Sequence, residues 1–139
     1  MEKMLRVIAT GRVALVAALV IVVLSLIPAG NWYHGLGIEG LDHYIAYFAL
    51  SFLLLYGCQD RLGWAARMAG AMTLGLFIEL VQPYFHRGME LPDVYANAAG
   101  IASGALLVLL VRAAVSFLHR HMLDFGLAKA GAAADNVAP

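Results

Sequence analysis

The chain has 139 residues, of which 63% are hydrophobic and only 13% are charged, and its mean hydropathy is +0.81. A soluble domain is typically about 25% charged, so this composition excludes an ordinary water-soluble protein and predicts one compact integral membrane domain. The formal net charge of zero excludes a strong field that would attract nucleic acid, and the single cysteine, Cys58, excludes an internal disulfide.

Four segments approach the length of a membrane-spanning helix, which needs about 20 mostly apolar residues to cross a hydrocarbon core about 30 Å thick. We therefore predict an all-α membrane protein, a four-transmembrane-helix bundle that occupies residues 1–117 as one domain. The predicted spans are residues 7–27, 42–57, 64–82 and 93–115. The first span has the basic start of a signal peptide, but Ile27-Pro28-Ala29 lacks a small-x-small cleavage pattern, so we expect this span to be retained.

The distribution of lysine and arginine predicts the orientation of the spans. Only Arg87 falls on the outer side of the predicted membrane. The other side holds both termini and the loop between the second and third spans. The remaining basic residues all fall on that side, and they are Lys3, Arg6, Arg12, Arg61, Arg67, Arg112, Arg120 and Lys129. We therefore expect both termini in the cytoplasm, with residues 118–139 as a cytoplasmic tail that is largely disordered after Phe125.

The alternating direction of the spans predicts that polar residues far apart in the sequence meet at the outer end of the bundle. These residues are Asp42, His43, Glu79, Gln82, Arg87, Asp93 and Asn97. A rise of about 1.5 Å per residue places Glu79 about one helical turn inside the outer interface. A carboxylate at this depth must be paired, protonated or hydrated, and we expect Arg87 to be the partner of Glu79, with His43 and His86 as further candidates.

Structural roles compete with functional roles for several of these residues. Asp42 could cap the second span, and Asp93 could stabilise the first turn of the fourth span, where negative charge suits the helix dipole. A buried network of Glu79, Gln82 and Arg87 could serve helix packing alone.

Small residues form stripes on the third and fourth spans. Ala71 and Gly75 lie on the same helix face as the acidic end of the third span, and Gly100 and Gly104 continue the face of Asn97. Such small-xxx-small patterns let helices approach closely. We therefore predict that the third and fourth spans pack along these stripes, with their polar ends together.

The sequence resembles the signature of VanZ-like membrane proteins at Glu79-x-x-Gln82, Arg87, Asp93, Asn97, Gly100 and Gly104. The motif His43-Tyr-Ile-Ala-Tyr47 is similar to one on an earlier helix of that family, although Glu39 and Gly40 stand where the family often has an Asp-Lys pair. The resemblance covers about residues 39–104. It implies a bacterial inner (plasma) membrane protein with a role in the cell envelope. The family takes its name from an accessory protein of glycopeptide resistance, linked to reduced susceptibility to teicoplanin, and the resemblance supplies neither a reaction nor a cofactor.

The first functional hypothesis is an outer site that binds, or acts on, a lipid-linked or amphiphilic component of the envelope. The candidate catalytic residues are Glu79 and Asp93 as bases and His43 as acid or base. The candidate substrate-binding residues are Arg87, Gln82, Asn97 and Asp42. His43, Glu79 and Asp93 could instead hold a divalent metal, but no ligand spacing of a known metal motif supports a metal site. An enzymatic activity is left open.

Two other functions are compatible with the same residues. In one, the chain is a structural or accessory subunit whose polar network only fixes helix packing, and it docks to an envelope protein or to a second copy of itself. In the other, the chain is a small proton-coupled transporter with Glu79 as the proton carrier. Membrane lipids are expected neighbours in all three cases.

Overall fold

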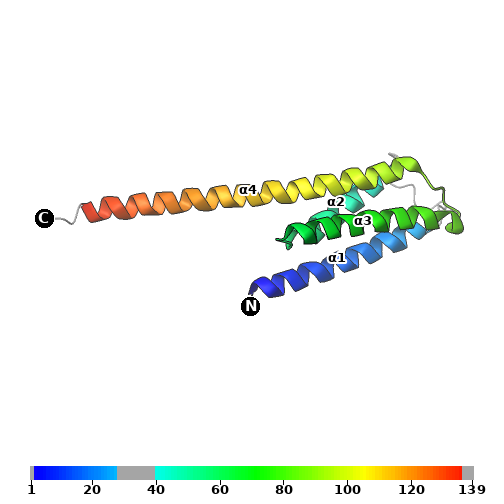
Figure 1. Cartoon of the computed structure of the whole chain (residues 1–139), viewed down its shortest axis with the longest axis horizontal. Helices are drawn as coiled ribbons and strands as arrows, with labels where there is room; N and C mark the ends of the chain where they lie inside the picture. Colours follow the sequence, from blue (N-terminus) through cyan, green and yellow to red (C-terminus); the bar gives the residue numbers. More distant parts are fainter. Residues whose placement is uncertain (1, 28–39, 136–139) are drawn as a thin grey trace. The chain divides into compact units, whose positions relative to one another are not determined.

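The structure, a computed structural model, describes the backbone of residues 2–27 and 40–135 and the side chains of residues 11–27, 40–123 and 125. Glu39, which belongs to the resemblance, lies outside these ranges. Helices are the only regular secondary structure in the described part, and this confirms the all-α prediction. The elements are α1 (Glu2–Leu26), α2 (Leu41–Tyr56), α3 (Arg61–Val81), the short 3-10 helix η1 (Gln82–Phe85) and α4 (Leu91–Asp135) (Figure 1).

The chain divides into two compact units, residues 1–108 and residues 109–139. The first unit contains α1, α2, α3, η1 and the beginning of α4, and successive helices in it run in opposite directions (Figure 1). The helices begin and end within a few residues of the predicted spans, except that α1 starts earlier and α4 continues well beyond residue 115.

The second unit contains the rest of α4, which is helical as far as Asp135. This differs from the largely disordered tail that the sequence predicted. Residues 127–134 are mostly alanine, leucine and lysine, which are strong helix formers, so local propensity favours the helix. Within this unit the ring of Phe117 packs edge-on against His121, one turn later, with 4.3 Å between ring centroids.

Buried side chains from several helices form the core of the first unit. One cluster consists of Tyr47 and Leu50 of α2, Ala71 of α3 and Ile101 of α4, and partly buried residues of α1 pack against it. A second cluster lies further along α2 and α4 and consists of Leu55, Ala105 and Val108.

The glycine stripe of α4 packs against α2, which corrects the prediction that it faces the third span. A Cβ atom added to Gly100 would lie 2.9 Å from the backbone nitrogen of Phe48, and one added to Gly104 would lie 2.5 Å from the Phe48 carbonyl oxygen. On α3, a Cβ atom at Gly75 would lie 2.8 Å from Asn97 Nδ2 and 3.2 Å from the Tyr47 hydroxyl oxygen. The glycines of α4 thus admit the α2 backbone, whereas Gly75 admits two larger side chains.

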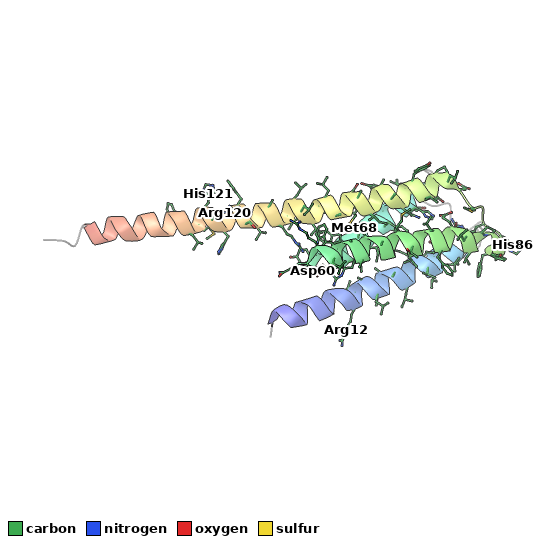
Figure 2. The ribbon with its side chains drawn as sticks, in the orientation of Figure 1. Arg12, Asp60, Met68, His86, Arg120 and His121 are labelled. Carbon is green, nitrogen blue, oxygen red and sulfur yellow. The ribbon has the colours of Figure 1, made fainter. Side chains whose placement is uncertain are left out.

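The loop between α2 and α3 is held by side-chain hydrogen bonds to the backbone. Asp60 is the N-cap of α3 and accepts a hydrogen bond from the Gly63 N–H, which holds the pKa of this carboxyl below its ordinary value. The Trp64 indole N–H donates to the carbonyl oxygen of buried Cys58 over 3.0 Å. Figure 2 shows Asp60 and His86 at opposite ends of the segment formed by α3 and η1.

Two helices are long and apolar enough to cross a membrane, judged by length and composition. They are Arg61–Phe85, with a mean hydropathy of 1.3, and Leu91–Leu123, with a mean hydropathy of 2.2. Only 22% of the residues in an apolar 18-residue stretch of each helix are buried, whereas the core helix of a soluble protein would be mostly buried. The described apolar helices Gly11–Leu26 and Leu41–Tyr56 are shorter. The structure therefore supports the predicted four-span bundle in a coarser form, as a helical chain with two candidate spans.

Candidate functional site

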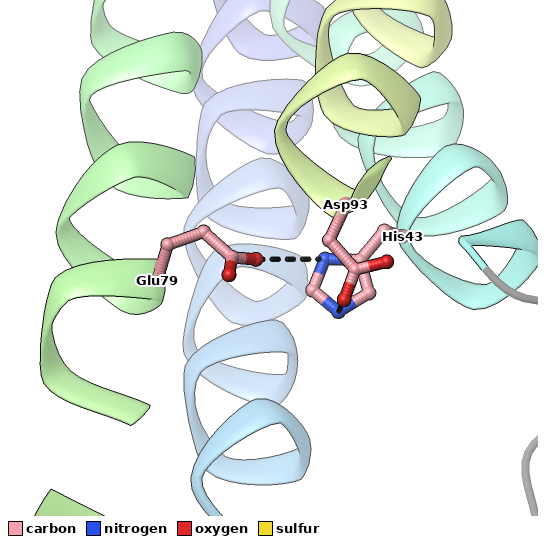
Figure 3. A group of neighbouring side chains, drawn as sticks. All are labelled: His43, Glu79 and Asp93. Carbon is pink, nitrogen blue, oxygen red and sulfur yellow. Dashed lines mark ion pairs between the residues drawn. The ribbon is translucent and has the colours of Figure 1, made fainter. Parts of the chain in front are cut away.

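Three helices bring one titratable side chain each to the same place. His43 comes from α2, Glu79 from α3 and Asp93 from α4 (Figure 3). His43 Nδ1 lies 3.6 Å from Glu79 Oε1, and His43 Nε2 lies 3.3 Å from Asp93 Oδ2. The start of α2, the end of α3 and the start of α4 therefore meet as the sequence predicted, with the histidine between the two carboxyl groups. We call these three residues the triad.

Gly40 allows the start of α2 to approach the start of α4. Its backbone is left-handed, with φ 73°, and its carbonyl oxygen accepts a hydrogen bond from the Tyr44 N–H over 2.9 Å. A Cβ atom at Gly40 would lie 3.1 Å from the Ala96 Cβ and 3.5 Å from Asp93 Oδ1. A residue without a side chain is therefore required here, both for the conformation and for the contact that places His43 beside Asp93.

Glu79 is fully buried, with 0% of its surface exposed. Its Oε2 accepts a hydrogen bond from the backbone N–H of Glu90 over 3.3 Å. Its Oε1 has no hydrogen-bond partner among the described residues, although it faces the His43 ring. Burying an unpaired carboxylate costs several kcal/mol, roughly, so this oxygen requires a proton, a cation or a ligand nearby.

Asn97 and Tyr47 form the inner wall of the site. Asn97 Oδ1 lies 3.2 Å from His43 Nδ1, and the side chain is 1% exposed. The Tyr47 hydroxyl oxygen is buried without a hydrogen-bond partner among the described residues. Tyr47 was not among the candidate residues, although its position four residues after His43 puts both on one helix face, which was the available signal.

A pocket of about 110 Å³ adjoins the triad and shares His43 with it. Ile21 and Leu24 of α1 give it apolar lining, and Asp42 and Arg87 give it charged lining. The complete lining is Ile21, Leu24, Ser25, Asp42, His43, Ala46, Tyr47 and Arg87. The lining of the pocket therefore combines apolar residues with charged ones, Arg87 among them.

Arg87 follows η1, and the backbone there explains its position. Pro83 lies in the first turn of η1, and His86 ends it in a left-handed conformation with φ 59°. The Arg87 N–H then donates to the Gln82 carbonyl oxygen over 3.2 Å. This turn directs Arg87 to the pocket, and the described ion pairs of Glu79 and Asp93 are with His43 rather than with Arg87. His43 thus occupies the place between the carboxyl groups that the sequence assigned first to Arg87.

Two of the predicted residues have visible structural contacts. Gln82 is buried and donates a hydrogen bond from Nε2 to the Ser25 carbonyl oxygen over 3.3 Å, so it connects the end of α3 to α1. Asp42 lies in the first turn of α2, whose N-cap position is occupied by Gly40 without a side-chain cap. Gln82 therefore stands at the edge of the site, whereas Asp42, His43 and Arg87 line the pocket.

The chemistry available at this site is acid-base catalysis, anion binding or metal binding. The imidazole and two carboxyl groups can transfer protons or hold a cation, and the guanidinium can bind a phosphate or carboxylate. No family model, curated protein or solved structure matches the chain, so the resemblance to VanZ-like proteins stays a prediction.

Proposed function

We propose that this chain is a four-span protein of a bacterial inner membrane with both termini in the cytoplasm. We further propose that its outer site binds, or acts on, a lipid-linked or amphiphilic component of the cell envelope. The pocket carries this proposal, because its lining combines the apolar side chains of Ile21 and Leu24 with the cationic residue Arg87. An amphiphile is the class of molecule that needs both kinds of contact at once.

The size of the pocket limits the kind of ligand that can enter it. The pocket volume of about 110 Å³ is small, so we expect a headgroup rather than a whole lipid to enter it. Apolar side chains of α1 remain exposed beside it, among them Val20, Val23 and Leu24. The headgroup would therefore enter the pocket while the tail lies along α1, and an anionic headgroup such as a phosphate suits Arg87.

The motif spacing that resembles VanZ-like proteins supports the same proposal. The residues of both motifs, from His43 on α2 and from Glu79 to Asn97 on α3 and α4, lie in one site. A role like that of a glycopeptide-resistance accessory protein is compatible with a site that handles an envelope lipid.

Binding of a paired set of probes tests the proposal. The full chain in lipid nanodiscs would be titrated with a short-chain polyprenyl phosphate and with the polyprenyl alcohol of the same length. We expect the phosphate to bind more tightly, because a charge-assisted hydrogen bond contributes about 1.5–3 kcal/mol, or about 10–100-fold in affinity. Arg87→Ala should abolish that preference. Arg61→Ala, which removes an exposed arginine from the start of α3, should leave it intact.

A structural or accessory role is the alternative, and the hydrogen bond from Gln82 to α1 favours it. In that case the two probes bind equally or not at all, and no ligand raises the unfolding temperature. Glu79→Gln, Arg87→Ala and Asp93→Asn would then lower stability and any envelope phenotype in parallel. A loss of phenotype in stably folded variants would contradict the structural role.

A further inference from the structure

The His43 ring is held as the ring of a metal ligand usually is. Nδ1 lies 3.2 Å from Asn97 Oδ1, an oxygen that only accepts hydrogen bonds, so neutral His43 in this arrangement carries its proton on Nδ1. The electron pair of Nε2 is then free, and it faces Asp93 Oδ2 at 3.3 Å. Two acceptors at this distance need a positive centre between them. Histidine ligands of metals commonly donate their other ring N–H to such an acceptor.

The unpartnered oxygen of Glu79 is the second, independent observation. Glu79 is 0% exposed, and its Oε1 turns toward the His43 ring without a hydrogen-bond partner among the described residues (Figure 3). One ligand atom from each member of the triad lies within 4.8 Å of the other two. With a neutral imidazole and both carboxyl groups ionised, the triad carries two negative charges, which a divalent cation would cancel.

We propose that the triad, His43, Glu79 and Asp93, binds a first-row divalent metal ion, with Asn97 orienting the histidine. Ligand atoms about 2.0–2.2 Å from such an ion can be at most about 4.4 Å apart. The 3.3 Å between His43 Nε2 and Asp93 Oδ2 meets this limit. Glu79 Oε1 lies 3.6 Å from the other ring nitrogen, Nδ1, and the ligand atoms of the group lie within 4.8 Å of one another, so coordination at Nε2 requires the Glu79 side chain to rotate toward that nitrogen. Three protein ligands leave a coordination position for water or for a ligand in the adjoining pocket.

The kind of ligand indicates the kind of ion. Imidazole suits zinc, iron, nickel and copper, whereas carboxylates suit magnesium, calcium and manganese. One imidazole with two carboxylates therefore favours Zn²⁺ or Mn²⁺ over Mg²⁺ and Ca²⁺. The chain's single thiol, Cys58, lies in the loop between α2 and α3, at the other end of α2 from His43. Sulfur is consequently excluded from the predicted coordination.

Direct binding of Zn²⁺ is the test. The full chain, purified in detergent without a histidine tag and stripped with a chelator, would be titrated with Zn²⁺ by calorimetry. We expect one equivalent to bind, with a rise in unfolding temperature because the ion binds the folded state. His43→Gln, Glu79→Gln and Asp93→Asn should each weaken binding by more than about tenfold, and Asn97→Ala by about 10–100-fold. His119→Ala, which removes an exposed histidine outside the triad, should bind as the unaltered chain does.

The inference is wrong if the unaltered chain binds neither Zn²⁺ nor Mn²⁺. That result is expected if His43 is instead an imidazolium that bridges the two carboxylates. It is also wrong if folded triad variants bind as tightly as the unaltered chain. X-ray absorption of the zinc-loaded chain gives a measurement that needs no variant. Nitrogen and oxygen neighbours with one imidazole are expected, and sulfur or several imidazoles would contradict the triad.

Ion binding rests on the triad's geometry alone, whereas any part of the ion in ligand binding rests on the proposed function. The two can fail separately. If the metal-free chain distinguishes the polyprenyl phosphate from the alcohol while no ion binds, the proposed function stands without the metal. If an ion binds at the triad and neither probe does, the metal site stands without the lipid ligand.

Discussion

Gly40 has a backbone conformation, φ 73°, that a residue with a side chain adopts only with strain. Its replacement by alanine would also place a Cβ atom 3.1 Å from the Cβ of Ala96 on α4. We expect Gly40→Ala to lower the free energy of unfolding by about 1–2 kcal/mol and to weaken Zn²⁺ binding, because the start of α2 must shift away from Asp93.

The matched control for this prediction is Gly70→Ala in α3. A Cβ atom there meets no other atom within 4 Å, so the change should leave stability unaltered or raise it by up to about 1 kcal/mol. Denaturant unfolding in detergent micelles measures both variants. Equal stability of the two would show that the conformation of Gly40 does not constrain the site.

Residue types alone were enough to select most members of the site. His43, Glu79, Asp93 and Asn97 are polar residues near the ends of apolar helices, and the structure brings all four together. Residue types did not predict which of these side chains contact one another. Arg87 was the natural partner by charge, yet the left-handed turn at His86 directs it to the pocket, and His43 is the residue between the carboxyl groups.

The close contact between α2 and α4 depends on the glycines along one face of α4, because they leave room for the backbone of α2. A larger residue at Gly104 would overlap the backbone of Phe48, whose carbonyl oxygen lies 2.5 Å from the position of an added Cβ atom. We expect Gly104→Val to cost about 1–3 kcal/mol of stability, the usual result of overpacking, and to separate the two helices.

Ala102→Val is the control for the helix contact, because Ala102 is exposed on the same helix and the substituted residue is the same. It should change the free energy of unfolding by no more than about 0.5 kcal/mol, as is typical of exposed sites. Thermal unfolding of both variants measures the difference in stability. If both substitutions have the same effect, the close approach of α2 and α4 does not contribute to stability.

Across the whole molecule, the number of spans can be measured by labelling from outside the cell. In a Cys58→Ser background, single cysteines would be introduced as Asn31→Cys, Gln59→Cys and Met89→Cys and treated with a membrane-impermeant thiol reagent in intact cells. Four spans with both termini inside predict that positions 31 and 89 react and position 59 does not, because the two loops on the outer side contain the first pair.

A chain that crosses only with α3 and α4 gives a different pattern. Residue 89 would still react, whereas residue 31 would remain on the same side as residue 59 and be protected. Permeabilised cells, in which residues 31, 59 and 89 should all become reactive, provide the control for cysteine accessibility. The pattern at residue 31 therefore separates the four-span arrangement from the two candidate spans found by length and composition.

The sequence by itself determined the all-helical class of the described chain, the approximate limits of α2 and α3 and the end of the helices at which the polar residues meet. These follow from hydropathy and from the alternating direction of consecutive helices, which are local or additive properties of the chain. The predicted disorder beyond Phe125 is wrong, because the alanine-rich sequence there has a high helix propensity and α4 continues to Asp135.

Only the tertiary structure decided which faces of the helices meet. The rotation of a helix about its axis depends on how the side chains of several helices pack at once, and no single segment encodes it. That rotation places Gly100 and Gly104 against α2 rather than α3, brings Tyr47 to the wall of the site and puts His43 between Glu79 and Asp93.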